Sequence, residues 1–166
     1  MNKKQRKKNL VTSKEVLICL PKQAYITDPC YKEDVINQGG GLLADIKPGH
    51  WSCCTLFDNE EKRILRLMAN HVDHDYIGLS DSTEVLGAIG VDSGQAGIFD
   101  ADYYRKNVDD KQWYSQKPCR ATSTALGFDS IDGVAVVSSS GWGDGCYAVH
   151  VSRDEAGVIV NITIVF

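Results

Sequence analysis

The sequence has no apolar run long enough to cross a membrane. About 18 consecutive apolar residues are needed for a spanning helix, and the longest runs here cover residues 16–20 and 134–137. The polar residues 12–15 also interrupt the apolar stretch that a secretory signal peptide would need after its basic start. We therefore expect no membrane partner and a location in the cytoplasm.

Cysteine is too sparse for a disulfide scaffold, because the chain has six among 166 residues and such scaffolds exceed about 8%. No Cys-x-x-Cys pair occurs. The adjacent Cys53 and Cys54 would point to opposite faces of a strand, which suits neither a zinc site nor an ordinary disulfide. We interpret the cysteines as reduced thiols, and we expect no metal and no cofactor.

The short motifs of several common enzyme classes are also missing. The chain has no Gly-x-x-x-x-Gly-Lys-Ser/Thr phosphate loop, no Gly-x-Ser-x-Gly elbow and no Asp-x-Asp-x-Asp-Gly calcium loop. Residues 71–75 hold two histidines and two aspartates, but His71 and His74 would lie on opposite faces if extended. We therefore expect a solvated loop there, and the sequence names no catalytic residue.

Positive charge is concentrated at the N-terminus, where the first ten residues carry five of the 18 basic groups and no acidic one. The rest of the chain has 13 basic groups against 22 acidic ones, a net charge of −9. An acidic body repels phosphate at long range, which argues against nucleic-acid binding. We interpret residues 1–13 as a disordered basic tail and residues 14–166 as a single β domain.

The sequence does contain many short apolar or alternating runs, which are typical of β-strands. In the last run, residues 158–166, five apolar side chains share one parity, as in a strand with one face on the core. This strand should therefore lie inside the packing. The other predicted strands are 16–20, 23–27, 50–57, 63–69, 85–91, 97–99, 134–138 and 147–152.

Helical periodicity is scarce, and only residues 32–38, 100–106 and 109–116 fit short helices. Many short strands joined by Gly-rich turns favour an all-β fold. We predict an antiparallel β-sandwich or a partly closed barrel, with one to three short helices.

Three segments, at residues 25–31, 90–100 and 141–147, carry an aspartate in a turn between apolar runs. In the first, Asp28 can accept hydrogen bonds from the amides of its own turn, while a proline forces the reversal. The third can present Trp142 as a stacking platform, or backbone amides to an anion. Each segment also has a purely structural interpretation as a tight turn.

Residues 91–94 resemble the hydrophobic-Asp-Ser/Thr-Gly signature of aspartic proteases, in which two carboxylates share a proton to activate water. The resemblance covers four residues, and Gln95 stands where the retroviral-type enzymes usually have alanine. The same residues fit a tight turn, in which Gly94 adopts a positive φ.

Taken together, residues 28–31 (DPCY), 91–95 (VDSGQ) and 143–147 (GDGCY) resemble segments of a family of uncharacterised bacterial and phage proteins, a domain of unknown function. The resemblance would span about residues 16–151. It implies a shared fold and supplies no reaction, and it suggests that the three segments belong together.

Our first hypothesis is a cytoplasmic binding module that recognises a small polar ligand or a partner protein at one end of its sheets. The alternatives are an Asp-dependent hydrolase, with or without a divalent cation, and a structural or assembly protein without a ligand site. We expect the Asp92 turn and residues 138–145 to be neighbours. The predicted ligand-binding residues are Asp28, Asp92, Ser93, Gln95, Trp142, Asp144 and Tyr147.

Overall fold

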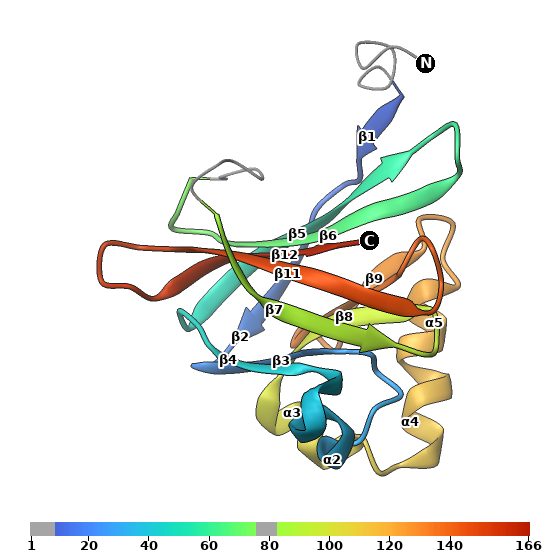
Figure 1. The fold of residues 1–166 in the computed structure, drawn as a ribbon, viewed down its shortest axis with the longest axis horizontal. Coiled ribbons are helices and arrows are strands. Elements are labelled where there is room, and N and C mark those ends of the chain that lie inside the picture. The colour runs from blue at the N-terminus through green and yellow to red at the C-terminus, as the bar shows by residue number, and fades with distance from the viewer. Residues whose placement is uncertain (1–8, 76–82) are drawn as a thin grey trace.

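The computed structural model describes residues 9–75 and 83–166. Within these residues, twelve strands form two antiparallel sheets that pack against each other (Figure 1). The sheets do not close into a barrel, and the predicted β-sandwich is confirmed. None of the described helices is long and apolar enough to cross a membrane.

The larger sheet has seven strands. Six follow the order β1-β5-β6-β12-β11-β7, and β2 pairs with another part of β5 on the same edge as β1. Most of these strands were predicted from alternation, but β1 was not. The strands are β1 (Leu10–Thr12), β2 (Val16–Leu20), β5 (Gly49–Asp58), β6 (Arg63–His71), β7 (Glu84–Val91), β11 (Gly145–Arg153) and β12 (Ile159–Val165).

The smaller sheet has the order β4-β3-β8-β10-β9. Its two edge strands have four residues each and were missed in the sequence, because neither Leu-Leu-Ala-Asp nor Phe-Asp-Ser-Ile alternates apolar and polar residues. The strands are β3 (Gln23–Thr27), β4 (Leu42–Asp45), β8 (Gln95–Asp100), β9 (Phe128–Ile131) and β10 (Ala135–Ser139).

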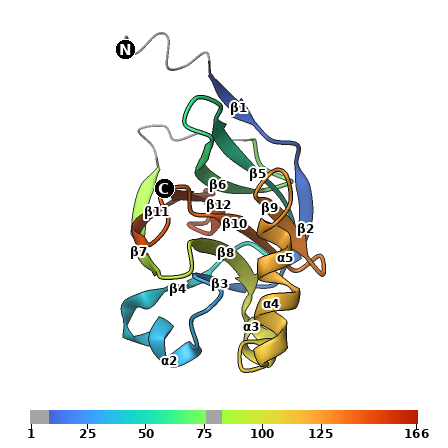
Figure 2. The same ribbon diagram turned by 90° about the vertical axis from the view of Figure 1, so that its right-hand side faces the viewer.

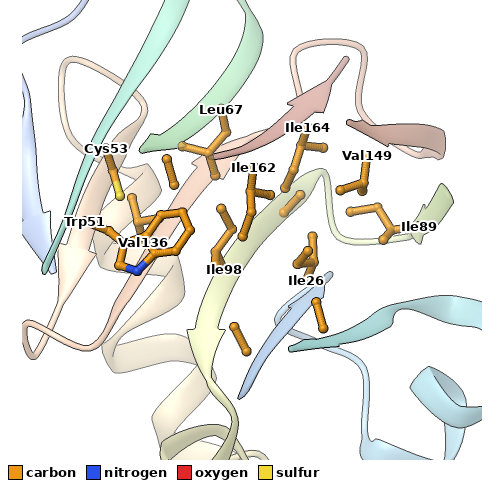
Figure 3. Packing of buried hydrophobic residues seen from close by; sticks show 14 of the residues in the cluster. Ile26, Trp51, Cys53, Leu67, Ile89, Ile98, Val136, Val149, Ile162 and Ile164 are labelled. Atoms are coloured by element: carbon orange, nitrogen blue, oxygen red, sulfur yellow. The ribbon is translucent and has the colours of Figure 1, made fainter. Parts of the chain in front are cut away.

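The main core fills the space between the two sheets (Figure 3). Neighbouring residues alternate between this core and the outer face of the smaller sheet, as the period of a strand requires. Ile98 and Val136 point into the main core, whereas Phe99 and Val137 belong to a second cluster on the outer face.

Short helices cover that outer face (Figure 2). Trp113 and Tyr104 pack from the helices onto Phe99, with ring centroids 6.1 and 4.8 Å from its own. The side chains of Asp100 and Asp110 cap two of the helices. The helical segments are α2 (Glu33–Val35), η1 (Ile36–Gly40), α3 (Ala101–Asn107), α4 (Lys111–Gln116) and α5 (Pro118–Thr122), the last of which was not predicted.

Strand β12 lies in the middle of the larger sheet, between β6 and β11, as expected for an interior strand. Its parity changes near the start, because Val160 is an extra residue opposite the step from Ser152 to Arg153. Ile159, rather than Val160, therefore joins the main core together with Ile162.

Strand structure begins nearer to the N-terminus than the basic composition of this segment predicted. Leu10 is already in β1 and pairs with Asp58, although residues 10–13 were assigned to the disordered tail. This short strand forms because β5 extends past the end of β2 and has backbone groups there with which β1 can pair. No local pattern in the sequence reveals this pairing. Residues 1–8 of the predicted tail lie outside the described residues.

Candidate functional site

The carboxylate of Asp28, directly after β3, is fully buried and accepts four hydrogen bonds. Its Oδ1 accepts from the Cys30 amide at 2.8 Å and from the Ser93 hydroxyl at 2.6 Å. Its Oδ2 accepts from the Asp92 and Ser93 amides, both at 2.8 Å. Both carboxylate oxygens are thus engaged by donors of the protein. Asp28 therefore fastens its own turn to the β7–β8 turn.

Tyr31 makes a second link between the same two turns. Its hydroxyl donates to Asp92 Oδ2 at 2.7 Å, and its carbonyl accepts from the Tyr104 hydroxyl at 2.5 Å. Asp92 presents its amide, and not its carboxylate, to Asp28. The two carboxylates have separate donors, so this geometry gives no support to a proton-sharing pair of the aspartic-protease type.

The thiol of Cys30 lies beside Asp28 and Ser93. Cys30 is an exposed residue, but partial desolvation of its thiol, followed by hydrogen bonding to Asp28, raises the pKa of Cys30 to about 12. Tyr114 also contacts Ser93, and burial raises the pKa of Tyr114 to about 12. A nucleophilic cysteine needs a lowered pKa, so Cys30 is not activated for attack at neutral pH.

The loop between β10 and β11 packs against the β7–β8 turn, as predicted. The Ser140 amide donates to the Gly94 carbonyl at 2.9 Å, and a Cβ on Gly94 would lie 3.9 Å from the Gly143 Cα. Two hydrogen bonds stabilise the conformation of this loop. The Ser140 and Tyr147 hydroxyls both donate to the Gly143 carbonyl, at 2.6 and 2.8 Å. The second and third segments therefore belong to one assembly of turns.

The remaining predicted site residues point in different directions. Gln95 is 8% exposed and donates to Thr122 Oγ1 at 2.7 Å, so its side chain faces α5. Asp144 is exposed. Trp142 is 60% exposed, and the Arg63 guanidinium lies over its ring, 3.6 Å from the centroid. Trp142 is thus a surface platform, already covered on one face by a cation.

A pocket of about 440 Å³ opens beside this assembly. Its walls come from residues 57 and 62–64 of the β5–β6 hairpin and from residues 124–127 between α5 and β9. Ser139 and three glycines of the turns complete it. Four lining glycines, at 94, 127, 141 and 143, have positive φ values between 67° and 85°. Glycine is required at position 141 because the loop packs closely against the backbone of the hairpin there. A Cβ would lie 2.0 Å from the Ile64 carbonyl oxygen.

The charge of the pocket is opposite to that of the chain. Lys62 and Arg63 line it, whereas no Asp or Glu is among the described lining residues. Arg63 Nε lies 3.2 Å from Glu61 Oε2, just outside the lining. A pocket of this size is within the usual range for small-molecule sites, about 300–1,000 Å³.

Sequence reasoning missed Lys62 and Arg63. They follow a charged reversal at residues 58–61, and their composition is that of an ordinary solvated hairpin turn. Nothing in the local sequence indicates that this hairpin lies over Gly141, because that contact joins segments almost eighty positions apart.

The opposite end of the sandwich holds a different cluster of polar side chains. Lys47 donates to His74 Nε2 at 2.7 Å and lies 3.7 Å from Asp154 Oδ2. His71, which was expected in a solvated loop, is instead buried at the end of β6, with Nε2 3.0 Å from the Pro48 carbonyl. Because β6 continues to residue 71, the histidine is drawn into the packing, and its ring meets the edge of Trp51.

Across residues 9–75 and 83–166, no three His, Cys, Asp or Glu side chains are arranged to hold a metal ion. Pockets of about 360 and 370 Å³ elsewhere have carboxylates in their lining, whereas the pocket beside the glycine turns has two cations and no carboxylate among its described lining residues, and this charge makes it the candidate site.

The chain matches a family model described as "Protein of unknown function (DUF4241)" over residues 57–164. The match covers more than half of the chain, so the protein belongs to this family, and the expectation of a domain of unknown function is confirmed. The matched region includes the turn of the β5–β6 hairpin, the Asp92 turn and the 140–145 loop, but not Asp28 or most of β5. No curated protein and no solved structure matches the chain.

Proposed function

We propose that this member of the DUF4241 family is a binding module whose ligand is a small polar anion, held in the pocket beside the glycine turns. The observation that carries the proposal is the lining itself: two cations and no carboxylate, in a chain with 22 acidic and 18 basic residues. A pocket of one sign concentrates ligands of the other.

The position of Arg63 supports this proposal. Its guanidinium carbon lies 3.6 Å from the centroid of the Trp142 ring, and a cation held over an aromatic face has fewer orientations open to it. A pre-oriented guanidinium loses less rotamer freedom when it binds an oxyanion. Trp142 would then orient the guanidinium that binds the ligand.

The backbone of Lys62 supports it as well. Lys62 has φ 53°, in the left-handed region that glycine adopts more readily. A strained backbone at the rim of a pocket is a reason to look for a binding role of its side chain.

We also propose that the protein works in the cytoplasm. All six cysteines are free thiols, as is usual in a reducing compartment.

The binding proposal is tested by thermal-shift titration with a panel of small carboxylates and phosphates at constant ionic strength. We expect at least one of these anions to raise the melting temperature through linkage, and Arg63→Gln to remove the shift. Lys62→Gly should weaken the shift while leaving the unliganded protein at least as stable, because glycine relieves the positive φ.

The matched control is Lys106→Gln, which removes an exposed cation on α3 outside the pocket. It should leave the shift unchanged. An absence of any shift across the panel, or a shift that survives both pocket substitutions, would overturn the proposal.

A further inference from the structure

The net charge around the pocket distinguishes between classes of anion. Lys62 and Arg63 contribute two positive charges, and Glu61 lies 3.2 Å from the Arg63 Nε edge. Asp58 is not among the described lining residues, and its Oδ1 accepts from the Glu60 and Glu61 amides within the hairpin turn. These charges leave about one uncompensated positive charge. One such charge matches a carboxylate, whereas a phosphate monoester carries about −1.5 to −2 at neutral pH.

The geometry of the guanidinium favours the same class. Trp142 covers one face of Arg63 and Glu61 lies at its Nε edge, which restricts the orientation of the fork. A planar fork and a planar carboxylate form two parallel hydrogen bonds.

The rest of the lining is apolar on the side of the hairpin and the α5–β9 loop. Phe57, Ile64, Ala125 and Leu126 are there, and Leu126 is 41% exposed. Ile64 is only 3% exposed, so an apolar group attached to the anion would remove mainly Phe57, Ala125 and Leu126 from water. Each buried methylene then strengthens binding by roughly fourfold.

We infer that the pocket takes an amphiphilic monocarboxylate, whose carboxylate binds at Lys62 and Arg63 and whose short apolar part lies on Phe57, Ile64 and Leu126. The inference rests on the proposed function and specifies its ligand class.

The test is an NMR titration of the ¹⁵N-labelled full chain with three probes, acetate, hexanoate and inorganic phosphate, at equal ionic strength. The amides of Gly94, Gly127 and Gly143 report on the pocket. We expect hexanoate to bind at least about tenfold more tightly than acetate, and phosphate to bind more weakly than hexanoate.

Two exposed leucines provide matched variants. Leu126→Ser should reduce the advantage of hexanoate over acetate by at least about threefold while leaving acetate binding unchanged. Leu43→Ser, which alters a β4 side chain that is 44% exposed and outside the pocket, should change neither.

The possible failures are distinguishable. Phosphate binding at these amides as tightly as hexanoate, or equal affinities for hexanoate and acetate, would overturn the monocarboxylate inference and leave anion binding standing. Shifts absent for all three probes, or unaffected by Arg63→Gln, would contradict both.

Discussion

At the pocket end of the sandwich, strand connections are joined by one buried carboxylate that accepts from backbone amides of two turns. At the other end, connections are joined by side chains: Lys47 binds His74 and lies near Asp154. The two ends can be followed in Figure 1, with the β11–β12 turn at the left and the end of β7 beside α5 at the right.

The difference has a structural consequence. Backbone amides and glycines take little space, so the first end can be tied closely and still leave a cavity of about 440 Å³. At the second end, the rings of His71, Trp51 and His74 pack edge to face. The second end also has a pocket, of about 360 Å³, but Glu15 and Asp75 line it, whereas the described lining of the first pocket has two cations and no carboxylate.

The largest effect should come from truncating β12, the central strand that runs between the two ends of the sandwich. Deleting residues 162–166 removes Ile162 and Ile164, both fully buried, and each is worth about 1.5–3 kcal/mol. Together with the lost pairing to β6 and β11, this is comparable to the whole stability of a small domain, about 5–15 kcal/mol. We expect no cooperative melt by circular dichroism. A truncated protein that melts near the full chain would refute an interior role for β12, and deletion of Phe166 alone is the control.

The next largest effect should come from the Asp28 carboxylate, which connects its own turn to the β7–β8 turn. Asp28→Asn replaces an acceptor oxygen by an amide group that faces backbone donors, and we expect a loss of about 3 kcal/mol in the free energy of unfolding. Asp92→Asn, which alters an acceptor of the Tyr31 hydroxyl, should cost about 1 kcal/mol or less. Urea denaturation measures both. Equal losses of unfolding free energy would mean that Asp28 contributes no more than Asp92 to holding the two turns together.

A pair of glycines separates close packing from backbone strain at the same end. Gly141→Ala would place a Cβ 2.0 Å from the Ile64 carbonyl oxygen, whereas the equivalent atom on Gly143 has nothing within 4 Å. Both have positive φ, which costs alanine about 1 kcal/mol. We expect Gly141→Ala to destabilise the protein by about 2 kcal/mol more than Gly143→Ala in the same denaturation experiment. Similar losses would show that the loop tolerates displacement from Ile64.

The smallest effect concerns acid titration at the second end. Hydrogen bonds from the backbone, chiefly the Val158 amide, lower the pKa of Asp154, and Lys47 contributes through its charge. Because the folded pKa is lowered, the ionised form stabilises the fold above the unfolded value of about 3.9. This contribution is lost as the pH falls through the folded pKa.

Lys47→Met should raise the pKa of Asp154 only part of the way towards its ordinary value, since the amide of Val158 remains. A carboxyl NMR titration in wild type and variant measures the change. A pKa that does not move would remove Lys47 from the electrostatics of this end, and Lys106→Gln is the control.

Much of the fold could be read from local patterns. Alternation predicted nine strands, including β6 and β12, because a strand with one buried face must repeat every two residues. The turn at Asp28 was also predictable, since Pro29 and an aspartate set its geometry without help from the rest of the chain. Strands β1, β4 and β9 were not, because three or four residues acquire strand structure only from a partner.

For the site, the sequence determined that the aspartate and glycine segments form tight turns, because side-chain acceptors and positive φ act over a few residues. Only the tertiary structure decided that Asp28 accepts from the Asp92 turn, that Gln95 faces α5, and that Arg63 covers Trp142. These contacts depend on strand order and on the register shift between Leu56 and Phe57 in the β5–β6 hairpin. Register is a property of paired strands, so the position of a charged hairpin over a distant glycine loop has no local signature.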